Sequence, residues 1–140
     1  MIDFWATWCD VCTAEMKYFV RAQETLKKLG ELCSTGRFVG DAPAAIVVLK
    51  DLNNKRWADV DCAQAVQNMA DAGWALGLGT CWVGNFDGAK IGATLGVKEG
   101  WAIFTILPFG YADAKNPPQA RPLKPRTEMV HYERVGNPKP

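Results

Sequence analysis

The sequence DCAQAVQNMADAGWALGLGTCWVGNF, residues 61–86, predicts a nearly uncharged helix, a glycine stop and a short aromatic strand. It contains two acidic residues, Asp61 and Asp71, and no Lys or Arg. A helix with so little charge on any side is not expected on a solvent-exposed surface. We therefore expect this helix in the middle of a domain or of a dimer, with the strand leading out of that buried scaffold.

The ends of this helix are predicted by ordinary capping rules. A carboxylate near the N-terminus favours the helix dipole, so the helix is expected to start at Asp59 or Asp61. Glycine adopts the left-handed backbone that closes helices, so the helix is expected to stop at Gly77 or Gly79. The result is a helix of about 16 residues, or ~24 Å.

Shorter patterns on either side predict helices packed on a sheet. In chain order we expect short strands at 2–5 and 17–20, an amphipathic helix over Thr25–Cys33, a buried strand at Ala44–Leu49, a helix over Asp87–Leu95 closed by Gly96, and a buried strand at Ala102–Leu107 ended by Pro108 and Gly110. Seven of the eight prolines lie from Pro108 onward. The last thirty or so residues are therefore expected to form an extended arm.

Composition limits the classes of protein that fit. With 140 residues, 49% of them hydrophobic, the chain is most simply one domain. The net charge of +1 and the scattered basic residues predict no nucleic-acid partner. No apolar run reaches the ~20 residues of a membrane span and no signal peptide is evident, so a cytoplasmic location is expected. Five cysteines argue against a fully paired extracellular framework, and Cys33, Cys62 and Cys81 are expected to be buried thiols.

Five sequence blocks occur in an order that resembles the FMN-dependent nitroreductase family. They are YFVRAQETLKKLGEL, DAPAAIVVL, the long helix, the Gly-Leu-Gly strand, and the Pro-Phe-Gly-Tyr strand with its basic tail, and they span about residues 17–134. The resemblance implies an α+β fold with a mixed β-sheet flanked by helices and an extended C-terminal arm. It also implies a homodimer that binds FMN between subunits and passes electrons from NAD(P)H to nitroaromatic, quinone or similar small-molecule acceptors.

The strand after the long helix is the predicted wall of a flavin site. A flavin ring needs an apolar slot with a few backbone donors and acceptors at its polar edge. Gly84 allows the main chain to approach a ring, and Asn85 offers both a donor and an acceptor. The resemblance places Trp82, Val83, Gly84 and Asn85 at positions that line the flavin. Without the resemblance, an ordinary core strand is the simpler interpretation of these residues.

Lys124 and Arg126 are the candidate phosphate ligands. Two residues apart in an extended segment, they would point the same way and could hold one phosphate. The resemblance matches them to the tail lysine and arginine that hold the FMN phosphate in the family. The alternative from the residues alone is a solvated tail.

The front of the chain departs from the family. Family members begin with a helix carrying an arginine-serine-arginine pattern and continue with asparagine and glutamine-proline-tryptophan segments at the flavin. This chain has MIDFWATWCDVCTAEM instead, so half of the expected flavin cradle is missing.

Residues 1–19 resemble the active-site segment of thioredoxin-like proteins. In that interpretation Cys9 is the nucleophile and Cys12 the resolving thiol. The segment is too short for a full domain, so we divide the chain into this segment, a partial nitroreductase-like domain over 20–136 and a tail over 137–140. The alternative functions are thus a thiol-disulfide oxidoreductase or a recombined, non-catalytic member of the fold. No metal site is predicted, because there is one Cys-x-x-Cys and one histidine, His131.

Overall fold

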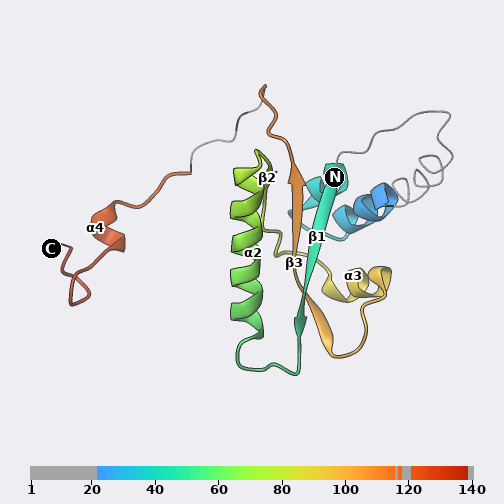
Figure 1. The fold of residues 1–140 in the computed structure, drawn as a ribbon, viewed down its shortest axis with the longest axis horizontal. Coiled ribbons are helices and arrows are strands. Elements are labelled where there is room, and N and C mark those ends of the chain that lie inside the picture. The colour runs from blue at the N-terminus through green and yellow to red at the C-terminus, as the bar shows by residue number, and fades with distance from the viewer. Residues whose placement is uncertain (1–21, 116, 118–120, 139–140) are drawn as a thin grey trace.

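The computed structural model describes residues 22–115, 117 and 121–138 (Figure 1). A helix over 22–31 is followed by η1 (Arg37–Asp41), β1 (Ala44–Asp51), α2 (Ala58–Ala75), β2 (Gly79–Thr80), α3 (Gly88–Leu95), β3 (Trp101–Gly110) and α4 (Arg126–Met129). The predicted α+β class is confirmed. The strands expected at 2–5 and 17–20 lie outside the described residues.

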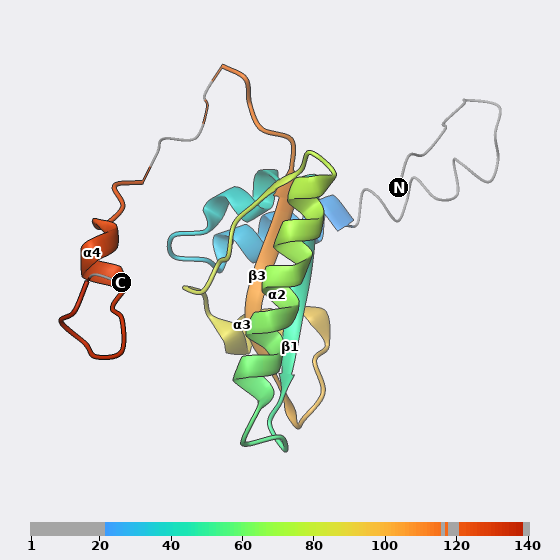
Figure 2. The same cartoon turned by 60° about the vertical axis from the view of Figure 1, so that its left-hand side comes forward.

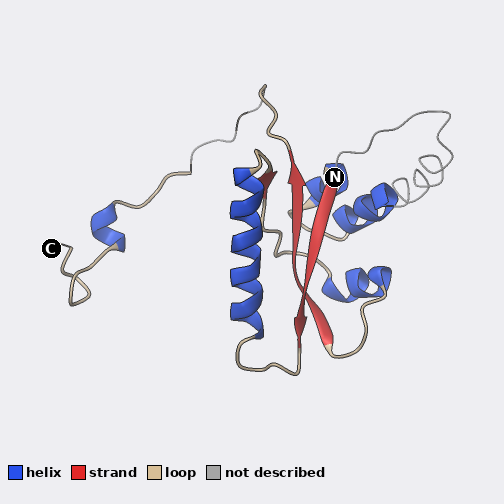
Figure 3. Cartoon of the chain, viewed as in Figure 1, coloured by secondary structure: helices blue, strands red, loops and turns tan. Residues whose placement is uncertain are grey.

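Within the described residues the sheet has the strand order β1-β3-β2, and β3 is antiparallel to both of its neighbours. Helix α2 covers one face, while the helix over 22–31, η1 and α3 lie on the opposite face (Figures 1 and 3). Between β1 and β3, Val48 pairs with Thr105, but the next residue of β1, Leu49, pairs with Ile103. Phe104 is therefore skipped, as at a β-bulge, and has no partner residue in β1.

The hydrophobic core lies between the sheet and the helices on the side of α3. Its members include Leu29 of the first helix, Val39 of η1, Ile91 of α3 and Ile106 of β3, and none of them is more than 2% exposed. Leu26 joins them one turn before Leu29, as the helical spacing predicted. This cluster holds three separate elements against one face of β3.

Helix α2 begins one residue before Asp59 and ends at Ala75, so its predicted position is confirmed. Gly77 follows with a φ of 76°, the left-handed conformation expected after a helix end. Within its own chain the helix buries Cys62, Val66 and Gly73, whereas Trp74 is 79% exposed. The described part of the chain therefore does not enclose this helix, and its place in a dimer stays a prediction.

The prediction that Pro108 ends the last strand was wrong, because β3 continues to Gly110. Ile106, two residues earlier, directs its N–H and C=O groups toward Val83, so the proline nitrogen faces the same side of the strand. On that side the ladder is interrupted between the Thr80–Phe109 pair and the Val83–Ile106 bridge. The missing N–H thus falls where no backbone partner is required, and the Pro108 carbonyl accepts a hydrogen bond from Thr80 Oγ1 at 2.6 Å.

Helix α3 has a well-formed cap at each end, in agreement with the predicted element. The Asp87 carboxylate accepts a hydrogen bond from the Lys90 N–H at 3.1 Å, and Gly96 closes the helix with a φ of 68°. This backbone hydrogen bond, followed by the one from the Lys90 side chain, holds the pKa of Asp87 below its ordinary value. Asp87 also lies 3.0 Å from Lys90 Nζ as an ion pair.

Beyond β3 the described residues form the predicted extended arm, interrupted by the short helix α4. The arm leaves the top of the sheet and carries α4 away from α2 (Figure 2). Leu123 is 83% exposed and Val135 is 93% exposed, so these apolar side chains find no cover within the described part of the chain.

Candidate functional site

The candidate site begins with residues 82–85, which connect β2 to α3 and are called the 82–85 segment below. Val83 anchors it to β3: its N–H donates to the Ile106 carbonyl at 3.0 Å, and the Ile106 N–H donates to the Val83 carbonyl at 3.3 Å. Thr105 Oγ1 donates a further hydrogen bond to the Val83 carbonyl at 2.9 Å. The middle of the segment is therefore fixed to the central strand.

The far end of the segment is held by the loop after the first helix. The Ser34 N–H donates to the Asn85 carbonyl at 3.0 Å, and the Asp87 N–H donates to the Leu32 carbonyl at 3.0 Å. Cys33 and Phe86 form a bridge between these two contacts. The segment is thus supported on both sides by elements of the core.

The side chains of the segment divide between the core and solvent. Val83 is only 4% exposed and packs in the core, so only its main chain is available to a ligand. Trp82 is 46% exposed, and its ring lies 5.7 Å from that of Phe104 at an interplanar angle of 55°. A Cβ added at Gly84 would meet no atom within 4 Å. An aromatic surface therefore adjoins open main chain that a flat ligand could approach.

The main-chain geometry gives this open edge a polar pattern. In a trans peptide the C=O and N–H groups point in opposite directions, and the described chain contains no cis bond. Because the Val83 N–H and C=O both face β3, the preceding Trp82 carbonyl and the following Gly84 N–H face away from it. Among the described residues the Gly84 N–H has no hydrogen-bond partner. The segment thus presents an outward acceptor and an outward donor on either side of Val83.

The candidate phosphate ligands lie elsewhere in the chain. Lys124 and Arg126 are exposed and belong to the arm, which extends away from the sheet (Figure 2). They do not share one extended segment as predicted, because Arg126 begins α4, where Arg126 Nη2 lies 3.5 Å from Tyr132 Oη. The outward donor and acceptor of the 82–85 segment fit the polar edge of a flavin ring. Within one chain, however, Lys124 and Arg126 do not lie beside this segment.

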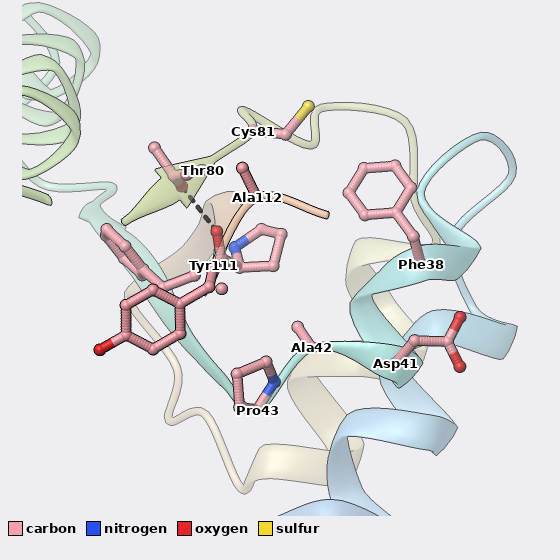
Figure 4. A pocket seen from close by; sticks show the side chains of 12 residues that line it. Phe38, Asp41, Ala42, Pro43, Thr80, Cys81, Tyr111 and Ala112 are labelled. Atoms are coloured by element: carbon pink, nitrogen blue, oxygen red, sulfur yellow. Dashed lines mark hydrogen bonds between the residues drawn. The ribbon is translucent and has the colours of Figure 1, made fainter. Parts of the chain in front are cut away.

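A pocket of about 350 Å³ is lined in part by Cys81, the residue just before the 82–85 segment (Figure 4). Phe38 and Asp41 of η1 line one side of it, and Cys81 and Tyr111 also belong to its lining. Its described lining contains one carboxylate and no cationic side chain, so its chemistry does not suit a phosphate. It provides instead a mostly apolar recess beside Cys81.

The cysteines differ in their surroundings. Cys33 and Cys62 are buried as predicted, but Cys81 is exposed, because it faces the pocket where the chain leaves the ladder. Burial raises the pKa of the Cys33 thiol. Burial also raises the pKa of Cys62, and the carboxylates of Asp59 and Asp61 add to the effect. Cys9 and Cys12 lie outside the described residues.

The described part of the chain contains no helix that combines the length and apolarity needed to cross a bilayer. It also contains no group of three or more His, Cys, Asp or Glu residues placed to hold a metal ion.

Comparison with known proteins gives the family. The model of the nitroreductase family matches residues 11–111. A protein of Methanothermobacter thermautotrophicus with the provisional name NADH dehydrogenase/NAD(P)H nitroreductase is 33% identical over 123 residues, which cover 82% of this chain and 62% of the relative. A protein of the same provisional name from Archaeoglobus fulgidus is 32% identical over 101 residues, 66% of this chain and 58% of the relative. This chain belongs to the nitroreductase family.

Solved structures agree with the fold. An FMN-dependent nitroreductase from Clostridium difficile R20291 is similar with a TM-score of 0.70 and 22% identity, covering 81% of this chain and 71% of the other. The NADPH:FMN oxidoreductase of Vibrio harveyi, solved with NAD+, has a TM-score of 0.70 and 20% identity, covering 82% and 56%. The chain spans about three fifths of the length of the curated relatives above. Its membership of the family supports an oxidoreductase.

Proposed function

We propose that this chain binds FMN and transfers electrons from NAD(P)H to a small acceptor such as a nitroaromatic compound or a quinone. The observation that carries the proposal is the outward donor and acceptor of the 82–85 segment beside the exposed Trp82. When bound, the flavin supplies the electron transfer, and the protein binds and orients it. NAD(P)H as the donor fits a cytoplasmic location, which we include in the proposal.

The site is completed, in this proposal, when two copies associate. Val60, Trp74 and Leu76 leave a large apolar area exposed along α2 and its C-terminal end. The arm carries its own uncovered apolar residues away from the body, so a second copy is the partner that would cover both surfaces. Lys124 and Arg126 would then grip the FMN phosphate, since paired cations suit a phosphate dianion.

Flavin titration tests the proposal. Purified protein mixed with FMN should quench flavin fluorescence with a defined stoichiometry and should oxidise NADH or NADPH with a quinone as acceptor. Replacing Lys124 and Arg126 together by Gln should weaken FMN binding by roughly tenfold or more, because each charged hydrogen bond to phosphate contributes about 1.5–3 kcal/mol. Lys98→Gln is the matched control, since Lys98 is an exposed lysine outside the arm. Wild-type protein that does not bind FMN would contradict the proposal.

The oligomeric state of the protein tests the proposal that two copies complete the site. Trp74→Glu introduces a charge into the exposed apolar area of α2, so light scattering should show a shift from dimer to monomer and FMN affinity should fall. Trp101→Glu changes a half-exposed tryptophan on β3 and should leave the dimer intact. Wild-type protein that is monomeric and still binds FMN would contradict a site shared between two copies. If the protein stays colourless and instead reduces insulin disulfides in a manner abolished by Cys9→Ser, the thiol-disulfide alternative is supported.

A further inference from the structure

We infer that Thr105 is a positioning residue for the bound ring, because its hydroxyl holds the Val83–Gly84 peptide so that the Gly84 N–H faces the ligand. The inference deepens the flavin proposal above and rests on it. It concerns a residue that makes no contact with a ligand itself. Thr105 acts through the main chain of the 82–85 segment.

The hydroxyl of Thr105 has one strong acceptor. Thr105 is completely buried, and its Oγ1 lies 2.9 Å from the Val83 carbonyl oxygen but 3.5 Å from that of Ile106. A hydroxyl has a single proton to donate, and the shorter contact is the better hydrogen bond. The proton is therefore directed to Val83. The backbone bond that reaches the same oxygen, from the Ile106 N–H, is longer at 3.3 Å.

Fixing this carbonyl fixes the next N–H group. The Val83 C=O and the Gly84 N–H belong to one planar trans peptide, so the N–H points opposite to the carbonyl. Gly84 is the most permissive residue of the segment, and no atom lies within 4 Å of the place where its Cβ would be. Among the described residues, no hydrogen bond restrains the Gly84 N–H on the outer side of this peptide. The restraint comes from the inner side, where Thr105 supplies the shortest hydrogen bond.

A structural role for the hydroxyl and a positioning role predict different results. If the hydrogen bond only satisfies a buried hydroxyl, removing the hydroxyl changes the free energy of unfolding and leaves the mobility of the Gly84 N–H unchanged. If it positions the peptide, its removal loosens the Gly84 N–H first. Two matched pairs separate the hydroxyl from the rest of the side chain. Thr105→Val keeps the shape and loses the hydroxyl, while Thr105→Ser and Thr105→Ala both lose the methyl group and differ from each other in the hydroxyl.

The first measurement uses protein without flavin. NMR relaxation and hydrogen exchange of the Gly84 amide should show greater mobility and faster exchange in Thr105→Val than in wild type, with the Ile91 amide in α3 unchanged. Thr105→Ser should resemble wild type. A Gly84 amide that behaves alike in Thr105→Val and wild type overturns the inference. If Thr105→Val does not fold, the Ser and Ala variants decide, and equal Gly84 behaviour in those two overturns it.

The second measurement is the FMN dissociation constant from flavin fluorescence. Thr105→Val should bind FMN about fivefold more weakly than wild type, the effect expected for one neutral hydrogen bond, and Thr105→Ser should stay within about twofold. An unchanged dissociation constant in a folded Thr105→Val variant overturns the inference. If wild type does not bind FMN, the flavin proposal fails on that result alone, whereas the amide measurement still decides whether Thr105 orients the peptide.

Discussion

Gly73 of α2 lies directly against the ring of Phe109 on β3, so closely that a Cβ on Gly73 would be 2.8 Å from Phe109 Cε1. Alanine in place of a helical glycine usually stabilises a protein by about 1 kcal/mol. Here the methyl group would force the ring away from the helix. We expect Gly73→Ala to lower the free energy of unfolding by about 1–2 kcal/mol, as overpacked core positions do.

Gly92 is the matched control for this substitution. It lies in α3, and its added Cβ would meet Val97 Cβ at an ordinary 3.8 Å. Gly92→Ala should therefore be neutral or stabilising in the same urea titration. Equal effects at the two glycines would show that the Phe109 contact does not determine the result.

The cap of α3 predicts a pH-dependent stability. The pKa of Asp87 is lowered in the folded protein, so its carboxylate stabilises the fold at pH values above the ordinary carboxyl pKa of 3.8, and this contribution is lost as the pH falls through the lowered folded value. Asp87→Ala should accordingly lower the melting temperature at pH 7. The difference in melting temperature between wild type and variant should shrink below about pH 4. A difference that stays constant from about pH 7 to below about pH 4 would show that the carboxylate is not its source.

The cysteines should react in a definite order. Cys81 is exposed, whereas Cys33 and Cys62 are buried and have raised pKa values, so their reactive thiolate forms are scarce. Peptide mapping after brief treatment of native protein with a maleimide should find Cys81 modified before the two buried thiols. Modification of all three at equal rates in urea, but not in buffer, serves as the control. Early modification of Cys33 in buffer would contradict the packing described for the core.

The core residue Ile91 should contribute strongly to stability. It is fully buried between α3 and the sheet, so Ile91→Ala should cost about 2–5 kcal/mol in a denaturant titration. Leu95 lies on the same helix and is 37% exposed, so Leu95→Ala should cost less than about 1 kcal/mol. A comparable loss at both positions would contradict the orientation of α3.

The sequence was most informative where local rules act alone. The cap at Gly96 and the periodicity of Leu26 and Leu29 depend on neighbours within one helix, and they were predicted correctly, whereas Asp87 caps the helix that it was expected to begin. Pro108 was misread because its tolerance depends on where another strand leaves the ladder. Where a neighbouring strand leaves the ladder is set by strand pairing, and the residues around Pro108 carry no information about it.

The residues of the candidate site stay a prediction, and the sequence offered only one continuous part of the arrangement around them, for a similar reason. Trp82, Gly84 and Asn85 were selected from one continuous segment, whereas Thr105 and Phe104 support it from a strand twenty residues further along the chain. A threonine within an otherwise apolar strand was the available signal for a buried hydrogen bond. The positions of Lys124 and Arg126 relative to the segment depend on the course of the arm, and spacing alone does not contain that information.

The tryptophans have a practical consequence for spectroscopy. Within the described residues Trp57, Trp74, Trp82 and Trp101 are all between 46% and 79% exposed. Their indole emission should therefore lie toward long wavelengths even in the native chain, and it should respond weakly to packing of the core. A blue shift on raising the protein concentration would instead report that another surface has covered them, which makes intrinsic fluorescence a label-free sensor of association.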